Sequence, residues 1–424
     1  MRAAPRTLLL TAVLAILALM AVLSGCGRNT LADTTVTSTA NAIPDGTGST
    51  GAPVSENGSA TAPPSTTAVP PVASVSAQPA LNSKGISPAQ PISVSVEQGT
   101  FDDVTLANPA GKLVDGKLSA DNTTWTTREV LGFGKTYTLK GSATGTDGRK
   151  IPVTGTFSTA ATNTQVRNTI NPADNAVVGV AAPISVTFGV EPQDKALIQK
   201  HVSVTTEPKV EGSWGWVKHD DGRWSLDYRT QKYWPAGTKV HVKANIYGLK
   251  LQDNAYAASD LSTDFSVGRN QVVVADVNSH VLVVKRDGQA VASYPASYGR
   301  GQDTGDPNLI TRSGIHVVNE FFETKLMNNP RYGYSNVPEK WAVRISNNGE
   351  FIHANPASTA AQGNSNVTHG CVNLSLADAQ AYYKSAIWGD PVEVSGTSVQ
   401  LGPEDGEIYI WAMPYDQWQK LSAL

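Results

Sequence analysis

A histidine and a cysteine in the last third of the chain are spaced as in a nucleophilic site. His353 ends the apolar stretch Phe351-Ile-His, and Cys371 lies within the run Thr368-His-Gly-Cys-Val-Asn373. A histidine can lower the pKa of a thiol and take its proton, and the resulting thiolate is a strong nucleophile. Gly370 leaves space beside the sulfur, and the backbone amides of Gly370 and Cys371 could stabilise an oxyanion. Acyl transfer through Cys371 is the chemistry that this pattern favours.

Two other roles are compatible with the same residues. His353, His369 and Cys371 could bind a metal ion, but they are only three ligands and do not have a recognised zinc spacing. Cys371 could also be an inert buried thiol, because free cysteine is often buried. The flanking histidine and glycine favour a nucleophile over both, so we expect neither a metal ion nor an organic cofactor.

Short strands and one helix are predicted to position this pair. Residues 271–276, 280–284 and 291–294 form β-prone runs separated by turns, which predicts an antiparallel meander. After Asn373 the apolar residues repeat at helical spacing, with Ser375 as the N-cap and Gly389 beyond the end. We expect this helix to pack behind the strand that carries the nucleophile. His280 and His316 fall in strand-like runs and are expected to be structural.

Two β-rich segments precede the chemistry, at residues 91–165 and 166–268. Both contain short runs of period two bounded by turns, and neither has a long helical pattern, which predicts two small sandwiches. The second segment is rich in tryptophan, for which packing is favoured over a sugar-binding surface. The final segment, 396–424, carries Trp411 and Trp418 and should fold back onto the domains, because exposed tryptophans on a free tail would favour aggregation.

The cysteine motif resembles the catalytic signature of the L,D-transpeptidases, the YkuD-domain family. The flanking runs Gly349-Glu-Phe-Ile-His353 and Ala361-Gln-Gly363 are similar to its actinobacterial branch. The resemblance covers residues 269–395, and the two β segments resemble immunoglobulin-like modules of actinobacterial cell-wall enzymes. It implies a mainly β chain, with two immunoglobulin-like sandwiches before a YkuD-type catalytic domain that has a helix after the nucleophile.

The resemblance also implies roles for individual residues. Cys371 would be the nucleophile and His353 the base, with the backbone carbonyl of Ala354 orienting the histidine and Gly370 in the oxyanion hole. The substrate site would be formed by His369, Asn373, Met327, Tyr332 and Trp341. Thr311-Arg-Ser-Gly314 departs from the Thr-Pro-x-Gly turn of many members, so the resemblance does not give the lid or the acceptor preference.

The implied reaction joins peptidoglycan tetrapeptide stems, which serve as both donor and acceptor. The thiolate would attack the carbonyl before the terminal D-alanine, D-alanine would leave, and an amine of a second stem would resolve the thioester into a 3→3 cross-link. Carbapenems would act as covalent inhibitors. One alternative is a sortase-type thiol acyltransferase, whose Thr-Leu-x-Thr-Cys motif is absent. The other is a non-catalytic wall-binding lipoprotein, against which the intact signature argues.

The N-terminus predicts export and a lipid anchor. Arg2 and Arg6 precede the apolar run 8–23, which is short for a bilayer span but typical of a signal peptide. The run ends at Leu23-Ser-Gly-Cys26, which resembles a bacterial lipobox. Residues 1–25 would therefore be removed, and lipidated Cys26 would hold the protein on the outer face of the cytoplasmic membrane, toward the cell wall.

Composition supports an anchored protein with a tether. Residues 26–90 lack aromatic side chains and carry few charges, so they cannot bury enough apolar surface to fold and should form an unfolded tether. The whole chain of 424 residues has 33 Lys and Arg against 36 Asp and Glu. It therefore lacks the excess of positive charge that is typical of nucleic-acid-binding proteins. Its two cysteines exclude a disulfide-rich scaffold.

Overall fold

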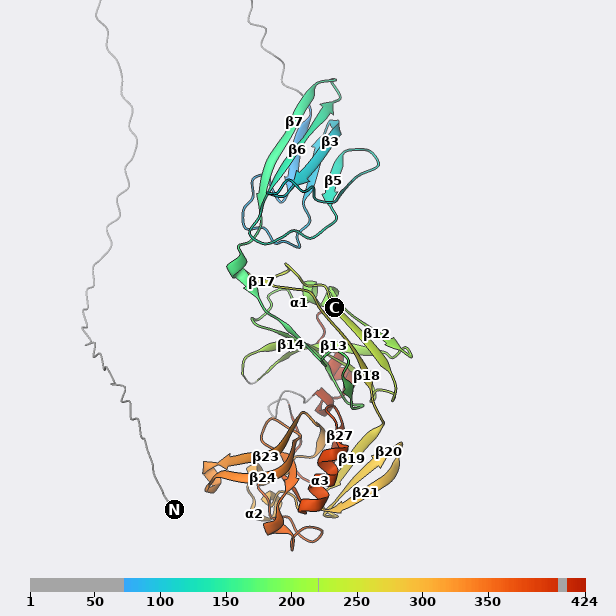
Figure 1. The fold of residues 1–424 in the computed structure, drawn as a ribbon, viewed down its shortest axis with the longest axis vertical. Coiled ribbons are helices and arrows are strands. Elements are labelled where there is room, and N and C mark those ends of the chain that lie inside the picture. Colours follow the sequence, from blue (N-terminus) through green and yellow to red (C-terminus); the bar gives the residue numbers. More distant parts are fainter. Residues whose placement is uncertain (1–71, 220, 403–409) are drawn as a thin grey trace, which may run out of the picture. The chain divides into compact units, whose positions relative to one another are not determined.

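The computed structural model describes residues 72–219, 221–402 and 410–424. The predicted signal peptide, Cys26 and most of the predicted tether lie outside these residues. The described part consists mainly of β-strands (Figure 1), as the sequence predicts. Within it, no helix combines the length and the apolar character needed to cross a membrane.

The first sandwich has two sheets with the strand order of an immunoglobulin constant domain. One sheet has the order β1-β2-β5-β4, formed by β1 (Ser74–Gln78), β2 (Ser93–Glu97), β5 (Thr124–Thr127) and β4 (Gly116–Leu118). The other has the order β3-β6-β7, formed by β3 (Gly99–Ala107), β6 (Thr136–Gly145) and β7 (Lys150–Ser158). Alternate residues of both sheets face a shared apolar core that includes Trp125 and Phe157.

The start of this sandwich corrects the domain boundary expected at residue 91. Strand β1 pairs antiparallel with β2, with Val75 opposite Val96, so folded structure begins well before that boundary. The sequence of β1, Ser-Val-Ser-Ala-Gln, has the small polar composition of the tether. Its strand structure depends on hydrogen bonds to β2, and local composition does not reveal such pairing.

The second sandwich is built from two four-stranded sheets and a small third sheet. The first sheet contains β10 (Val177–Val178), β18 (Leu261–Val267), β15 (Lys239–Ala244) and β12 (Val202–Glu207). The second contains β13 (Gly212–Lys218), β14 (Trp224–Thr230), β11 (Ile184–Phe188) and β9 (Thr169–Asn171). The small sheet contains β16 (Lys250–Gln252), β17 (Ala255–Ala257) and β8 (Gln165–Val166). A 3₁₀ turn, η1 (Thr162–Thr164), and helix α1 (Lys195–Lys200) complete it.

Its tryptophans serve packing. Trp216 and Trp234 are buried in the core of the sandwich, and Trp214 and Trp224 pack against that core while partly exposed. The indole nitrogen of Trp234 donates to the carbonyl of Ala182, which satisfies its polar atom inside the core.

The described C-terminal residues pack on the second sandwich. They form the 3₁₀ turn η6 (Ile410–Ala412) and helix α4 (Tyr415–Gln419). Trp411 Nε1 donates to the Ala181 carbonyl at 2.8 Å, and Trp418 Nε1 donates to the Ser213 carbonyl at 2.9 Å. Both indoles are buried there, so they are not exposed on a free tail.

The catalytic domain contains two sheets and one substantial helix. The first sheet contains β21 (Gln289–Pro295), β20 (Val281–Arg286), β19 (Gln271–Asp276), β27 (Pro391–Ser395) and β22 (Gly314–Val317). The second contains β23 (Glu320–Asn329), β24 (Tyr334–Arg344), β25 (Phe351–Ala354) and β26 (Val372–Leu374). Short helical turns lie at α2 (Gly301–Thr304), η2 (Pro307–Leu309), η3 (Pro330–Tyr332) and η4 (Pro356–Ser358).

Helix α3 (Leu376–Ser385) covers one face of the second sheet. Ser375 caps it by accepting from the Asp378 backbone nitrogen at 3.1 Å, as the sequence predicts. Its buried residues Ala379 and Tyr382 share a core with Ile352 of β25. The helix therefore supports the strand that precedes the nucleophile, from the side opposite the chemistry.

Candidate active site

A β-bulge places His353 on the open face of the second sheet. In the β24–β25 ladder, Lys340 pairs with Ala354 and Val343 pairs with Ile352, so two residues of β24 stand opposite His353 alone. Ile352 and Ala354 point into the core under α3. Because successive side chains of a strand alternate, His353 points to the other face.

Two oxygen atoms hold the inner nitrogen of His353. Its Nδ1 donates to the backbone carbonyl of Ala354 at 3.0 Å, where the sequence places the orienting group. A carboxylate oxygen of Glu339 lies 3.4 Å from the same nitrogen. With Nδ1 engaged, Nε2 is the nitrogen available to the thiol of Cys371.

Electrostatics favour the protonated form of His353. The ring is buried, with 4% exposed, and burial opposes the charged form. Hydrogen bonds and charges from Cys371 and Glu339 outweigh burial and raise the pKa of His353 above its usual value. The arrangement can therefore hold a protonated imidazole beside Cys371.

Sequence reasoning missed Glu339, because it expected a backbone acceptor alone. Glu339 lies in β24, next to the residue that pairs with Ala354, and it reaches His353 only through the β24–β25 ladder. The bulge in β24 interrupts the regular alternation of side chains, so counting residues along the strand does not show that Glu339 and His353 share a face. No local motif marks this residue.

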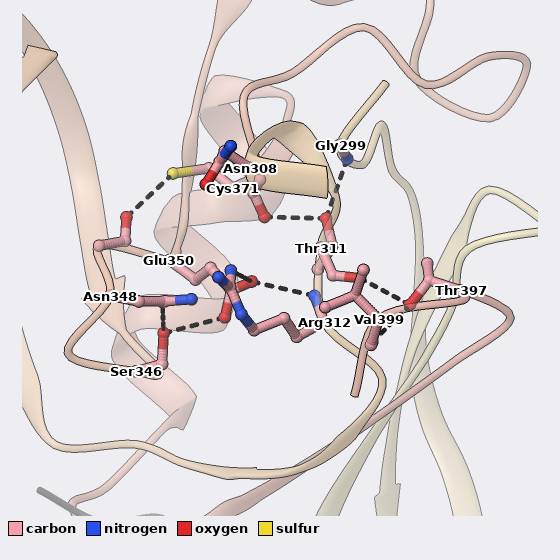
Figure 2. A network of polar contacts seen from close by, with 12 residues as sticks. Gly299, Asn308, Thr311, Arg312, Ser346, Asn348, Glu350, Cys371, Thr397 and Val399 are labelled. Carbon is pink, nitrogen blue, oxygen red and sulfur yellow. Dashed lines mark hydrogen bonds and ion pairs between the residues drawn. The ribbon is translucent and has the colours of Figure 1, made fainter. Parts of the chain in front are cut away.

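Two threonine hydroxyls clamp the loop that carries Cys371. Thr311 Oγ1 donates to the Gly370 carbonyl at 2.8 Å and accepts from the Gly299 backbone nitrogen at 2.9 Å (Figure 2). Thr368 Oγ1 donates to the Cys371 carbonyl at 2.6 Å and accepts from the Gly370 nitrogen at 3.2 Å. Gly370 has φ +119°, which a side chain would disfavour. The Gly370 N–H predicted for an oxyanion hole is thus engaged by Thr368 here.

The thiol of Cys371 contacts a turn that a buried carboxylate fixes. Cys371 is partly exposed, and its Sγ donates to the Gly349 carbonyl at 3.6 Å, as Figure 2 shows. The next residue, Glu350, is buried and accepts from the Arg312 backbone nitrogen and from Ser346 Oγ, both at 2.9 Å. These bonds fix the turn that ends beside the sulfur.

His369 and Tyr332, both predicted to line the substrate site, lie together. The His369 ring centroid is 5.5 Å from that of Tyr332 and 5.2 Å from that of Tyr334. Tyr332 donates its hydroxyl proton to Asp306 at 2.7 Å, which fixes the ring over the histidine. Sequence reasoning did not single out Tyr334.

The structure corrects the placement of Trp341. This side chain packs against Tyr383 of α3, with 5.3 Å between ring centroids, and joins the core beneath the sheet. It therefore faces away from His353, because the bulge, where Trp341 has φ +53°, changes the alternation of side chains. Met327 pairs with Val337 in the β23–β24 hairpin and is partly buried.

Asn373 is buried and ties neighbouring loops to the strand after the nucleophile. Its Nδ2 donates to Ser358 Oγ at 3.1 Å, and its backbone exchanges hydrogen bonds with Ser297. Its influence on a substrate would thus pass through these loops. Across 72–219, 221–402 and 410–424, no three His, Cys, Asp or Glu side chains form a group able to hold a metal ion.

The chain matches two family models and several known proteins. Residues 270–394 match the model of the L,D-transpeptidase catalytic domain, YkuD, and residues 83–250 match that of the bacterial Ig domain. L,D-transpeptidase 5 of Mycobacterium tuberculosis is 47% identical over 355 residues, which cover 84% of this chain and 78% of that protein. The chain belongs to the L,D-transpeptidase family.

Two further L,D-transpeptidases match with lower identity. L,D-transpeptidase 2 of M. tuberculosis is 33% identical over 79% of this chain and 81% of its own length. The solved structure of the LD transpeptidase LdtMt1 in complex with imipenem is 28% identical, with a TM-score of 0.45, over 55% of this chain and 99% of that one. The expected family, mainly β fold and L,D-transpeptidase activity are confirmed by the family models and the curated relatives.

Proposed function

We propose that this L,D-transpeptidase joins peptidoglycan stem peptides through a thioester on Cys371. The observation that carries the proposal is the hydrogen bond from His353 Nδ1 to the Ala354 carbonyl, which leaves Nε2 for the thiol proton. The thiolate forms a bond to the carbonyl carbon before D-alanine, and the C–N bond to D-alanine then breaks. The leaving amine takes its proton from His353 Nε2.

A second stem completes the reaction. Its side-chain amine attacks the thioester, the C–S bond breaks, and the sulfur recovers a proton through His353. The product is a 3→3 cross-link between two stems. The raised pKa of His353 supports this sequence, because an imidazolium–thiolate pair attacks without a prior proton transfer.

The same chemistry supports covalent inhibition by carbapenems. A β-lactam ring presents a strained amide carbonyl, so the thiolate of Cys371 would open it in the way that it attacks a stem peptide. The adduct would be a thioester that hydrolyses slowly when water cannot reach it.

We also propose that Cys26 carries a lipid and anchors the enzyme on the outer face of the cytoplasmic membrane. The charged start, the apolar run 8–23 and the Leu-Ser-Gly-Cys sequence support this location. The tether would then let the domains reach stem peptides in the wall.

The direct test is incubation of the purified full chain with a disaccharide-tetrapeptide, followed by mass spectrometry. We expect free D-alanine and a cross-linked dimer that lacks one D-alanine, and neither product with Cys371→Ala. Product formation by Cys371→Ala, or a wild-type protein that forms a thioester without D-alanine release, would contradict the proposal.

A further inference from the structure

Arg300 is built into the support of the nucleophile loop. Its backbone nitrogen donates to the Thr368 carbonyl at 3.1 Å, and its own carbonyl accepts from the backbone nitrogens of Asp303 and Thr304 in α2. Thr368 in turn bonds the Gly370 nitrogen and the Cys371 carbonyl. The base of the Arg300 side chain is therefore held at a defined place relative to Cys371.

The guanidinium of Arg300 sets the protonation of His369. Its Nη2 lies 3.2 Å from His369 Nε2. A guanidinium can only donate, so Nε2 is the acceptor and the ring proton is on Nδ1. Burial and the charge of Arg300 both lower the pKa of His369, which favours the neutral ring. His369 thus acts as a neutral acceptor that holds the guanidinium in place.

No carboxylate of the protein neutralises Arg300 among the residues that the structure describes. Asp306 accepts from Tyr332, Glu339 contacts His353, and Glu350 bonds the turn beside the sulfur. Arg300 forms no ion pair, and its Nε is buried with no hydrogen-bond partner. A partly exposed guanidinium that has no carboxylate partner favours an anion from outside.

We propose that Arg300 and His369 form a subsite for a carboxylate of the donor stem peptide. The fork of a guanidinium matches a carboxylate with two parallel hydrogen bonds, and His369 orients that fork by accepting from Nη2. Tyr332 and Tyr334 lie against the His369 ring and shield one side of the subsite from water. The inference rests on the proposed substrate, and it adds a residue that selects the donor.

Two carboxylates of a stem peptide have this chemistry. One is the terminal carboxylate of the leaving D-alanine, and the other is a side-chain carboxylate on the diamino residue. Both lie within a few bonds of the carbonyl that Cys371 attacks, so the test must distinguish them.

The test is a binding measurement that needs no turnover. The full chain with Cys371→Ala is titrated with a tetrapeptide stem by calorimetry, alone and combined with Arg300→Gln, Arg300→Lys or the control Lys384→Gln. Lys384 is an exposed cation in the last turn of α3. Each protein is titrated with three ligands: the unmodified stem, the stem with the D-alanine carboxylate amidated, and the stem with the diamino carboxylate amidated.

We expect Arg300→Gln to weaken binding of the unmodified stem about 10- to 100-fold. Arg300→Lys should weaken binding less, and Lys384→Gln should leave the affinity unchanged. Amidation of the carboxylate that Arg300 binds should weaken binding to the same degree, and Arg300→Gln should then cause no further loss. Equal binding by Arg300→Gln, or a loss that persists with both amidated stems, would overturn the subsite. Failure of the wild type to release D-alanine, with these affinities retained, would instead count against the proposed reaction.

Discussion

Arg229 in the second sandwich and Arg300 in the catalytic domain have different surroundings. Arg229 in β14 is buried with 3% exposed, and the C-terminal residues cover it. Its guanidinium carbon lies 4.8 Å from the ring centroid of Trp411 and 5.8 Å from that of Trp418. Arg300 is partly exposed and touches one histidine beside the nucleophile.

This difference separates a structural cluster from a functional one. Around Arg229 the chain supplies aromatic rings and the Ile410 carbonyl, so the cation contributes to packing. Around Arg300 the described residues supply one imidazole nitrogen and no carboxylate, and the guanidinium is partly exposed. Substitutions around Arg229 should change stability. Substitutions in the site of the catalytic domain should change activity.

The largest effect on activity is expected from Cys371→Ala. Removal of the nucleophile should lower turnover by more than about 10⁴-fold, because Cys371 is the only cysteine among the described residues. The folded state should persist, since the side chain is small and partly exposed. Intact-protein mass spectrometry with meropenem checks this: one adduct on the wild type and none on Cys371→Ala. An adduct that survives the substitution would exclude Cys371 as the nucleophile.

Glu339→Gln should have the next largest effect, through His353. Glu339 helps to raise the pKa of His353, so its neutralisation should lower that pKa. The imidazole would then lose its proton at a lower pH, so the basic limb of the kcat/KM profile should move to lower pH. On the basic limb we expect about a tenfold loss at a given pH, which corresponds to a fall of about one pKa unit, and little change at neutral pH, because the pKa of His353 is raised to about 10.

The matched control for this prediction is Glu323→Gln, an exposed glutamate in β23 of the same hairpin. Its pH profile should match that of the wild type. A profile of Glu339→Gln that coincides with both would show that the Ala354 carbonyl alone orients His353.

Thr311→Val should reduce both activity and stability. The substitution keeps the shape of the side chain but removes the hydroxyl that joins Gly370 to Gly299. A lost buried hydrogen-bond bridge costs about 1–3 kcal/mol, and a looser nucleophile loop should slow acylation. Thr311→Ser should restore both the acylation rate and the midpoint of thermal unfolding. Acylation by a carbapenem, followed by stopped-flow absorbance, and thermal unfolding measure the two effects.

Trp418→Ala should change stability with little change in activity. The indole is fully buried against the second sandwich and its Nε1 donates to Ser213, so truncation should cost about 3–5 kcal/mol. Acylation of the protein that remains folded at low temperature should proceed at the wild-type rate. Calorimetry and acylation kinetics test this. A large loss of acylation rate in fully folded protein would show that the two regions are coupled.

The smallest effect on chemistry is expected from Cys26→Ala. If Cys26 is lipidated, the substitution should move the protein from membrane to soluble fractions without altering acylation in vitro. Fractionation followed by immunoblotting measures the shift. Unchanged membrane association would contradict the lipobox.

The sequence by itself determined the parts that are encoded locally. Cys371, Gly370 and His369 lie within one short motif, and His353 is close enough along the chain to be recognised with it. The N-cap of α3 and the alternating strands of the sandwiches also follow from local pattern.

Only the tertiary structure decided which other residues meet the motif. Glu339, Thr311 and Arg300 reach the site through strand pairing and loop hydrogen bonds between distant segments, and no local signal marks such contacts. The bulge opposite His353 reverses the alternation on which a sequence count depends, which is why Trp341 lies in the core. Strand β1 is short and mostly polar, and its strand structure depends on pairing with β2, which local composition does not reveal.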